Sequence, residues 1–174
     1  MSYFLRVFCQ SDQPIDSSEI IDFIVDGCYF DETPHFEVDK FSEGDSLTPW
    51  KSLTVHYQAG KRPITISRNV NDFFLDSEVK ETIEIIELSS KSHLPPDLVN
   101  KLAASKQVIA LEIDPVGLTD DGWAMLDCLE AYLASRLSGI IYAPDDGFYD
   151  PKLQPLYKLK ETGDSTMKEA IAPA

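Results

Sequence analysis

The chain has 174 residues, enough for one domain, and its 43% hydrophobic and 26% charged residues match an ordinary folded protein. Its charge is unusual, because 30 acidic residues against 15 lysines and arginines give a formal net charge of −15. A field of this sign repels nucleic-acid phosphates and anionic membranes, so we expect no nucleic acid and no membrane as a partner.

The three cysteines, Cys9, Cys28 and Cys128, are widely spaced and odd in number. They form no CxxC pair, which excludes a zinc ribbon, and an odd count argues against a disulfide scaffold. The sequence begins without the pattern of a signal peptide, and no apolar run approaches the ~20 residues that span a bilayer. We therefore expect a cytoplasmic protein with reduced thiols, and no motif predicts a cofactor.

The first part of the chain alternates predicted strands with one helix. A helix is expected from its cap at Asp16 to Gly27, because Ile20, Ile21 and Ile24 recur at helical spacing. Segments rich in β-branched and aromatic residues predict strands, several of them with period-two alternation. These strands are expected at residues 3–9, 28–30, 35–38, 53–57 and 64–67.

The second part contains three predicted helices and two strands. The first helix is expected over residues 75–86, and Pro95-Pro96 opens a second, short one. The longest helix is expected to begin at the cap Thr119 and to end near residue 137. Nearly continuous apolar sequence predicts buried strands at residues 108–113 and 140–143.

These elements predict a single α+β domain over residues 1–150. Two β-α-β units, residues 3–30 and 108–143, are expected around one mixed or antiparallel sheet, with a β-hairpin and two helices inserted between them. A ferredoxin-like variant is the expected arrangement. Residues 151–174 are expected to form a C-terminal arm or tail that is able to dock on the domain.

One candidate metal site is the loop that follows the last predicted strand. Asp145, Asp146 and Asp150 offer three carboxylates around Gly147, and hard cations such as Ca²⁺ or Mg²⁺ require several converging oxygen ligands. The alternative is an Asp-Gly turn whose carboxylates accept hydrogen bonds from nearby backbone amides.

A second candidate metal site combines two predicted strands. His35, Glu37 and His56 lie on the polar faces of strands that are able to pair. In the right register, two imidazoles and a carboxylate would meet, which is a ligand set for zinc or iron. The alternative is a solvated strand face without metal.

Basic residues gather in the predicted hairpin. Residues 51–68 contain four bases and no acid, net +4, whereas residues 1–50 carry −9 (11 acids, 2 bases) and residues 69–150 carry −11 (16 acids, 5 bases). We expect these bases either to bind a small anion or an acidic patch on another copy of the chain, or to protect an exposed strand edge from aggregation. Trp50, beside them, is expected either to anchor a partner or to pack in the core. The bases are Lys51, Lys61, Arg62 and Arg68.

Three kinds of function remain open from the sequence. The first is a non-enzymatic protein-binding or regulatory module acting through a protein partner or self-association, since strong acidity speeds encounter with basic partners. The second is a metal-dependent hydrolase that uses residues 145–150 or the face of His35 and His56. The third is a small-molecule sensor domain. No nucleophile elbow, phosphate-binding loop or dinucleotide fingerprint is present, so the sequence favours a non-enzymatic role without deciding the question.

Overall fold

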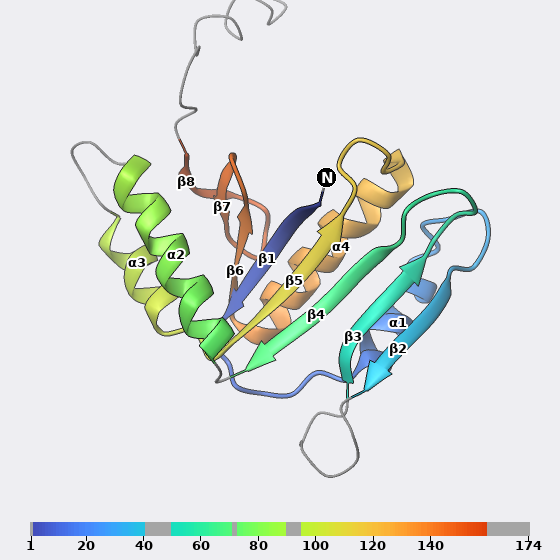
Figure 1. Ribbon diagram of the computed structural model, residues 1–174, viewed down its shortest axis with the longest axis horizontal. Helices are drawn as coiled ribbons and strands as arrows, with labels where there is room; N and C mark the ends of the chain where they lie inside the picture. The colour runs from blue at the N-terminus through green and yellow to red at the C-terminus, as the bar shows by residue number, and fades with distance from the viewer. Residues whose placement is uncertain (1, 41–49, 71–72, 90–94, 160–174) are drawn as a thin grey trace, which may run out of the picture.

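The computed structural model describes residues 2–40, 50–70, 73–89 and 95–159. Within these ranges the chain is an α+β protein with four helices and one antiparallel sheet of eight strands (Figure 1). The strands are β1 (Tyr3–Cys9), β2 (His35–Lys40), β3 (Trp50–His56), β4 (Ile64–Val70), β5 (Gln107–Ile113), β6 (Gly139–Ala143), β7 (Gly147–Tyr149) and β8 (Pro155–Lys158). The helices are α1 (Ser17–Asp26), α2 (Phe73–Ser89), α3 (Pro96–Ala103) and α4 (Asp120–Leu137).

The four predicted helices are confirmed. In α4 the predicted cap is present, because the Thr119 hydroxyl oxygen accepts a hydrogen bond from the amide of Gly122 at 3.1 Å. This bond satisfies one of the amides that every helix leaves free in its first turn. No helix in the described part of the chain is long and apolar enough to cross a membrane.

The strands lie in the order β2-β3-β4-β5-β1-β6-β7-β8, and every pair of neighbours is antiparallel. Since β1 runs antiparallel to both β5 and β6, these two strands are parallel to each other, and α4 connects them. The segment β5-α4-β6 is therefore a β-α-β crossover with β1 inserted between its strands.

The two faces of the sheet carry separate hydrophobic clusters, because successive residues of a strand point to opposite faces. Residues such as Val7 and Ile109 pack with the buried sides of α1 and α4, in one cluster. Their neighbours Phe8 and Val108 pack with α2 and α3, in the other. In Figure 1, α1 and α4 lie behind the sheet, and α2 and α3 lie at its left.

The strand predicted at residues 28–30 is wrong. The structure has a turn and bends there, because Cys28 takes a left-handed conformation with φ 51° directly after α1. The rings of Tyr29 and Phe30 pack against the core from this irregular segment, which explains the apolar pattern without a strand.

Part of the predicted C-terminal arm belongs to the sheet. β8 pairs with β7, with Phe148 opposite Tyr157. Residues 160–174 of this arm lie outside the described residues.

Candidate functional site

A pocket of about 390 Å³ lies beside α4, on the face of the sheet that α4 covers. Its walls come from α4, from strands β1, β6 and β7, and from the turns around β7. The lining residues are Tyr3, Leu5, Trp123, Asp127, Glu130, Ile141, Ala143, Asp146, Tyr149 and Leu153.

Regular periodicity brings these side chains together. Trp123, Asp127 and Glu130 are spaced i, i+4 and i+7, so they form one stripe along α4. On β6, Ile141 and Ala143 are two residues apart and point to the same face. The pocket is thus a product of the β5-α4-β6 crossover and of the hairpin that follows it.

Glu130 is the unusual residue of this pocket. Only 5% of its surface is exposed, and its Oε1 atom has no hydrogen-bond partner among the described residues. Burial, together with the nearby carboxyl group of Asp127, raises the pKa of Glu130 to about 8. At neutral pH the side chain is therefore mainly the neutral acid, which donates as well as accepts a hydrogen bond.

Two further acidic groups of the pocket are shifted in the same direction. Burial raises the pKa of Asp127 above its usual range. Burial, followed by the charges of Asp145 and Asp146, raises the pKa of Tyr3 to about 12. The Tyr3 hydroxyl donates a hydrogen bond to the carbonyl oxygen of Pro144 at 2.6 Å, which ties β1 to the turn after β6.

An ammonium group sits at the rim of the pocket. The Nζ of Lys158 lies 3.1 Å from Oδ1 of Asp146, and it is 4.6 Å from the centre of the Tyr149 ring. The Tyr149 hydroxyl donates to Oδ2 of Asp146 at 2.5 Å and accepts a hydrogen bond from Lys158. A carboxylate and an aromatic ring thus hold one cation together.

The predicted carboxylate loop is a pair of turns. Asp145 lies in the β6–β7 turn with φ 64°, a conformation that aspartate tolerates better than most residues. Oδ1 of Asp150 accepts hydrogen bonds from the amides of Lys152 at 2.8 Å and Gln154 at 2.9 Å, which hold the β7–β8 turn. Asp146 faces Tyr149 and Lys158 instead.

The structure brings His35, Glu37 and His56 together. His35 lies directly opposite His56 in the β2–β3 pair, with ring centres 5.8 Å apart. Nε2 of His56 is 3.4 Å from Oε2 of Glu37, an ion-pair distance when the imidazole is protonated. The two histidines and Lys61 line a shallow pocket of about 330 Å³.

Neither predicted metal site has the geometry of a metal centre. Across residues 2–40, 50–70, 73–89 and 95–159, no group of three or more histidine, cysteine, aspartate or glutamate side chains is placed to hold a metal ion. Metal binding at either place stays a prediction from the sequence.

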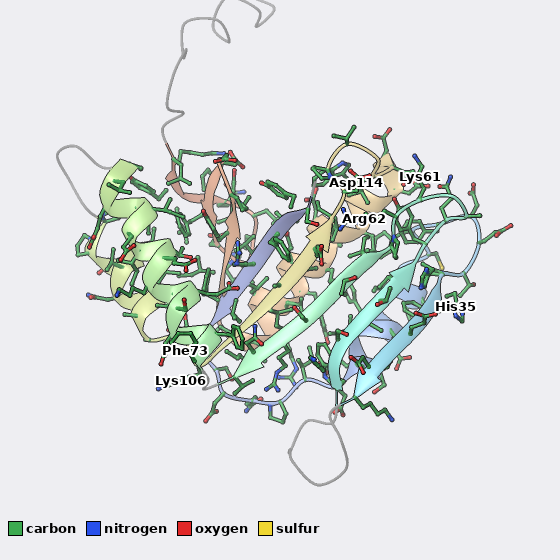
Figure 2. The ribbon with its side chains drawn as sticks, viewed as in Figure 1. His35, Lys61, Arg62, Phe73, Lys106 and Asp114 are labelled. Carbon is green, nitrogen blue, oxygen red and sulfur yellow. The ribbon has the colours of Figure 1, made fainter. Side chains whose placement is uncertain are left out.

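The basic surface predicted for the hairpin is smaller than expected. Trp50 is 1% exposed, in agreement with the packing alternative, and Arg68 is 7% exposed, so the expectation of a surface base is wrong for Arg68. Both point toward the α1 and α4 side of the sheet, where Arg68 donates to Oε1 of Gln107 at 2.7 Å. Lys51, Lys61 and Arg62 remain exposed, and Lys61 and Arg62 lie in and just after the β3–β4 turn (Figure 2).

Arg62 already has partners in the protein. Its Nη2 lies 2.9 Å from Oε1 of Glu112 and donates to the Ser2 hydroxyl at 2.7 Å. Binding of an external anion by Arg62 would compete with these contacts.

Sequence reasoning missed Glu130, although a signal was present. Glu130 follows Leu126 by four residues and precedes Leu133 by three, so it interrupts the buried stripe of α4. A carboxyl group at a core position marks a pKa-shifted, functional side chain more often than a surface acid does.

Comparison of the chain with models of known protein families, with curated proteins and with solved structures finds no match.

Proposed function

We propose that the protein is a small-molecule sensor domain whose ligand occupies the pocket beside α4. The observation that carries this proposal is Glu130, a buried residue of the pocket lining whose Oε1 has no hydrogen-bond partner among the described residues. An unsatisfied buried polar group costs about 1–3 kcal/mol of stability. A ligand that bonds to Glu130 would recover this free energy on binding.

The shape and composition of the pocket also support a ligand site. Small-molecule sites usually measure about 300–1,000 Å³ and combine apolar or aromatic walls with a few polar groups. At about 390 Å³, this pocket falls within that range. Leu5, Ile141 and Trp123 supply apolar surface, and Glu130 and Asp127 supply the polar groups.

The test is a screen of small cationic, neutral and anionic fragments by amide chemical-shift perturbation. Binding in the pocket should shift the amides of residues 3–5 and 123–130 first. Ala143→Leu fills the pocket and should abolish these shifts. Ala59→Leu makes the same change at an exposed position and should leave them intact. Fragments that bind only elsewhere, or that bind Ala143→Leu equally well, would contradict the proposal.

A protein-binding role, the first expectation from the sequence, is supported by the surface of α2. Phe73, Phe74 and Leu88 are 80%, 66% and 86% exposed on this helix. The same helix carries the acidic residues Asp76, Glu78, Glu81, Glu84 and Glu87. Exposed apolar residues at both ends of an otherwise acidic helix suit a partner with basic and apolar residues, and a second copy of the chain offers the basic Lys51 and Lys61.

Sedimentation at low and high salt tests this second proposal. Self-association that weakens with salt, and that Phe73→Ser with Phe74→Ser abolishes, would support it. A monomer at every protein and salt concentration would contradict the self-association version.

Two finer expectations from the sequence also remain proposals. A metal-dependent hydrolase would use Asp145, Asp146 and Asp150 or the face of His35 and His56. The ferredoxin-like arrangement also stays a proposal: the crossover β5-α4-β6 supports one β-α-β unit, whereas the unit expected over residues 3–30 lacks its second strand.

A further inference from the structure

Many of the residues that line the α4 pocket carry groups that attract cations. Asp127, Glu130 and Asp146 contribute three carboxyl groups, and Tyr3, Trp123 and Tyr149 contribute three aromatic rings. No lysine or arginine is among the lining residues in the part of the chain that the structure describes. Carboxylates attract cations by charge, and aromatic rings attract them through the negative potential of their faces.

We infer that the ligand of this pocket is a small organic cation, an amine or quaternary ammonium compound, held between the aromatic rings and the carboxyl groups of Asp127 and Glu130. This inference rests on the proposed function, since it names the class of ligand for the same pocket.

The protein already binds one ammonium group by this chemistry. At the rim, Lys158 contacts the carboxylate of Asp146 and lies over the ring of Tyr149. On its α4 wall, the pocket is lined by the Trp123 ring and by the carboxyl-bearing residues Asp127 and Glu130, which lie on one stripe of the helix. The α4 wall thus offers the same two kinds of group, an aromatic ring and carboxyl groups, that hold Lys158.

An organic cation suits the pocket better than a metal ion does. Ca²⁺ requires about six to eight oxygen ligands at roughly 2.3–2.6 Å, all converging on one point. Among the described residues, no group of three acidic, histidine or cysteine side chains is placed in that way. A pocket of about 390 Å³ with aromatic walls instead has room for a cation that carries carbon atoms.

Binding of a cation should release a proton. Without ligand Glu130 is mainly neutral at pH 7, because burial and Asp127 raise its pKa to about 8. A cation beside this carboxyl group favours the ionised form. The other titratable groups facing it are Asp127 on α4, Tyr3 on β1, and Asp146 and Tyr149 on the hairpin, with Lys158 on β8 as the cation paired to Asp146. Affinity should therefore rise from about pH 6 to about pH 8, by nearly tenfold per pH unit, and then level off.

Isothermal titration with matched probes tests the inference. Benzylammonium is compared with neutral benzyl alcohol, and choline with its neutral isostere 3,3-dimethylbutan-1-ol. We expect each cation to bind at least about tenfold more tightly than its neutral partner at pH 8. Titrations in two buffers with different ionisation enthalpies should show release of close to one proton per cation at pH 7.

Substitution of Glu130 supplies the decisive control. Glu130→Gln keeps the shape and the neutral state of the side chain, so it should fold, which its amide spectrum verifies. It should lose proton release and bind the cations at least about fiftyfold more weakly at pH 8, since the expected pH dependence corresponds to a fall of about two units in the pKa of Glu130 on binding. Glu84→Gln removes the same charge from an exposed position on α2 and should change neither quantity.

The outcomes separate the two proposals. Equal binding of cation and neutral isostere in the pocket, without proton release, would overturn the inference and leave the small-molecule function standing. Absence of cation binding up to about 10 mM, a free energy of only about −3 kcal/mol, would also overturn it. The proposed function itself fails when no fragment of any charge shifts the amides of residues 3–5 and 123–130, or when the fragments bind Ala143→Leu equally well.

Discussion

The indole Nε1 of Trp50 donates a hydrogen bond to the backbone carbonyl oxygen of Ile15 at 2.7 Å. Both residues are 1% exposed, so this bond is shielded from water. It joins the first residue of β3 to the segment just before α1, which are 35 residues apart in the chain. Trp50 therefore fixes where α1 begins relative to the far side of the sheet.

We predict that Trp50→Phe destabilises the protein by about 1–3 kcal/mol, because the buried carbonyl of Ile15 loses its donor. Urea unfolding followed by circular dichroism measures this change. Trp123→Phe makes the same substitution at a half-buried residue whose indole has no such bond to any of the described residues. It should cost clearly less. Equal losses in the two variants would show that ring volume, and not the Ile15 bond, sets the effect.

Gln107 has a comparable role at the start of β5. Its side chain is fully buried and donates to the carbonyl oxygens of Ser11 at 2.7 Å and Gln13 at 2.9 Å. Its Oε1 accepts the hydrogen bond from Arg68. One amide side chain thus connects β4 to the segment that follows β1.

We predict that Gln107→Leu costs about 2–5 kcal/mol of stability, since it removes three hydrogen bonds in a buried site. Gln107→Glu retains an acceptor for Arg68 but places an oxygen against two carbonyl oxygens, so it should also destabilise the protein at neutral pH. Gln58→Leu, at an exposed position, is the control. A loss for Gln107→Leu no larger than that of Gln58→Leu would contradict this account.

The sequence predicted what local periodicity determines. Apolar spacing predicted the four helices. The two histidines were expected to meet only if their strands paired in one particular register, and β2 and β3 pair in that register, with His35 opposite His56. The strand expected at residues 28–30 is absent because the left-handed conformation of Cys28 turns the chain. This turn lets Tyr29 and Phe30 pack against the core, a contact that local sequence does not reveal.

Local sequence pattern did not predict which polar side chains are buried. Arg68 counts as a surface base by residue type, yet it points inward because strand alternation places it on the core side with Ile64 and Ile66. The α4 pocket joins residue 3 to residues 123–153, and only the crossover of β5, α4 and β6 around β1 brings them together.

Asp150 tests the turn interpretation of the loop after β6. We predict that Asp150→Ala destabilises the protein by about 1 kcal/mol, because the amides of Lys152 and Gln154 lose their acceptor. Asp150→Asn keeps an oxygen at this position and should cost less. Thermal unfolding measures both changes.

Asp150→Asn also tests whether this loop binds a metal ion or is only a hydrogen-bonded turn. Because Oδ1 of Asp150 is bonded to two amides, we expect Ca²⁺ and Mg²⁺ at millimolar levels to leave the Tm unchanged. Any ion that binds only the folded state must raise it. A rise in Tm with either ion that is lost in Asp150→Asn would instead establish the metal site predicted from the sequence.

Glu130 should make stability depend on pH in a characteristic direction. Its pKa is about 8 in the folded protein, against an ordinary value of 4.5. Between these values the folded state holds a proton that the unfolded state has released, so stability falls as pH rises. The unfolding equilibrium constant should change by up to about tenfold per pH unit and become constant above about pH 8.

Glu130→Gln removes this titration while Asp127 and the other acids stay in place. We therefore predict that the stability of Glu130→Gln relative to the unchanged protein increases steadily from about pH 5 to about pH 8 and then remains level. Urea unfolding at a series of pH values measures the difference, and Glu84→Gln should show none of this trend. A constant difference across the range would mean that Glu130 ionises normally in the folded protein. Its carboxyl group would then be solvated, and the proton release expected on cation binding would have no source.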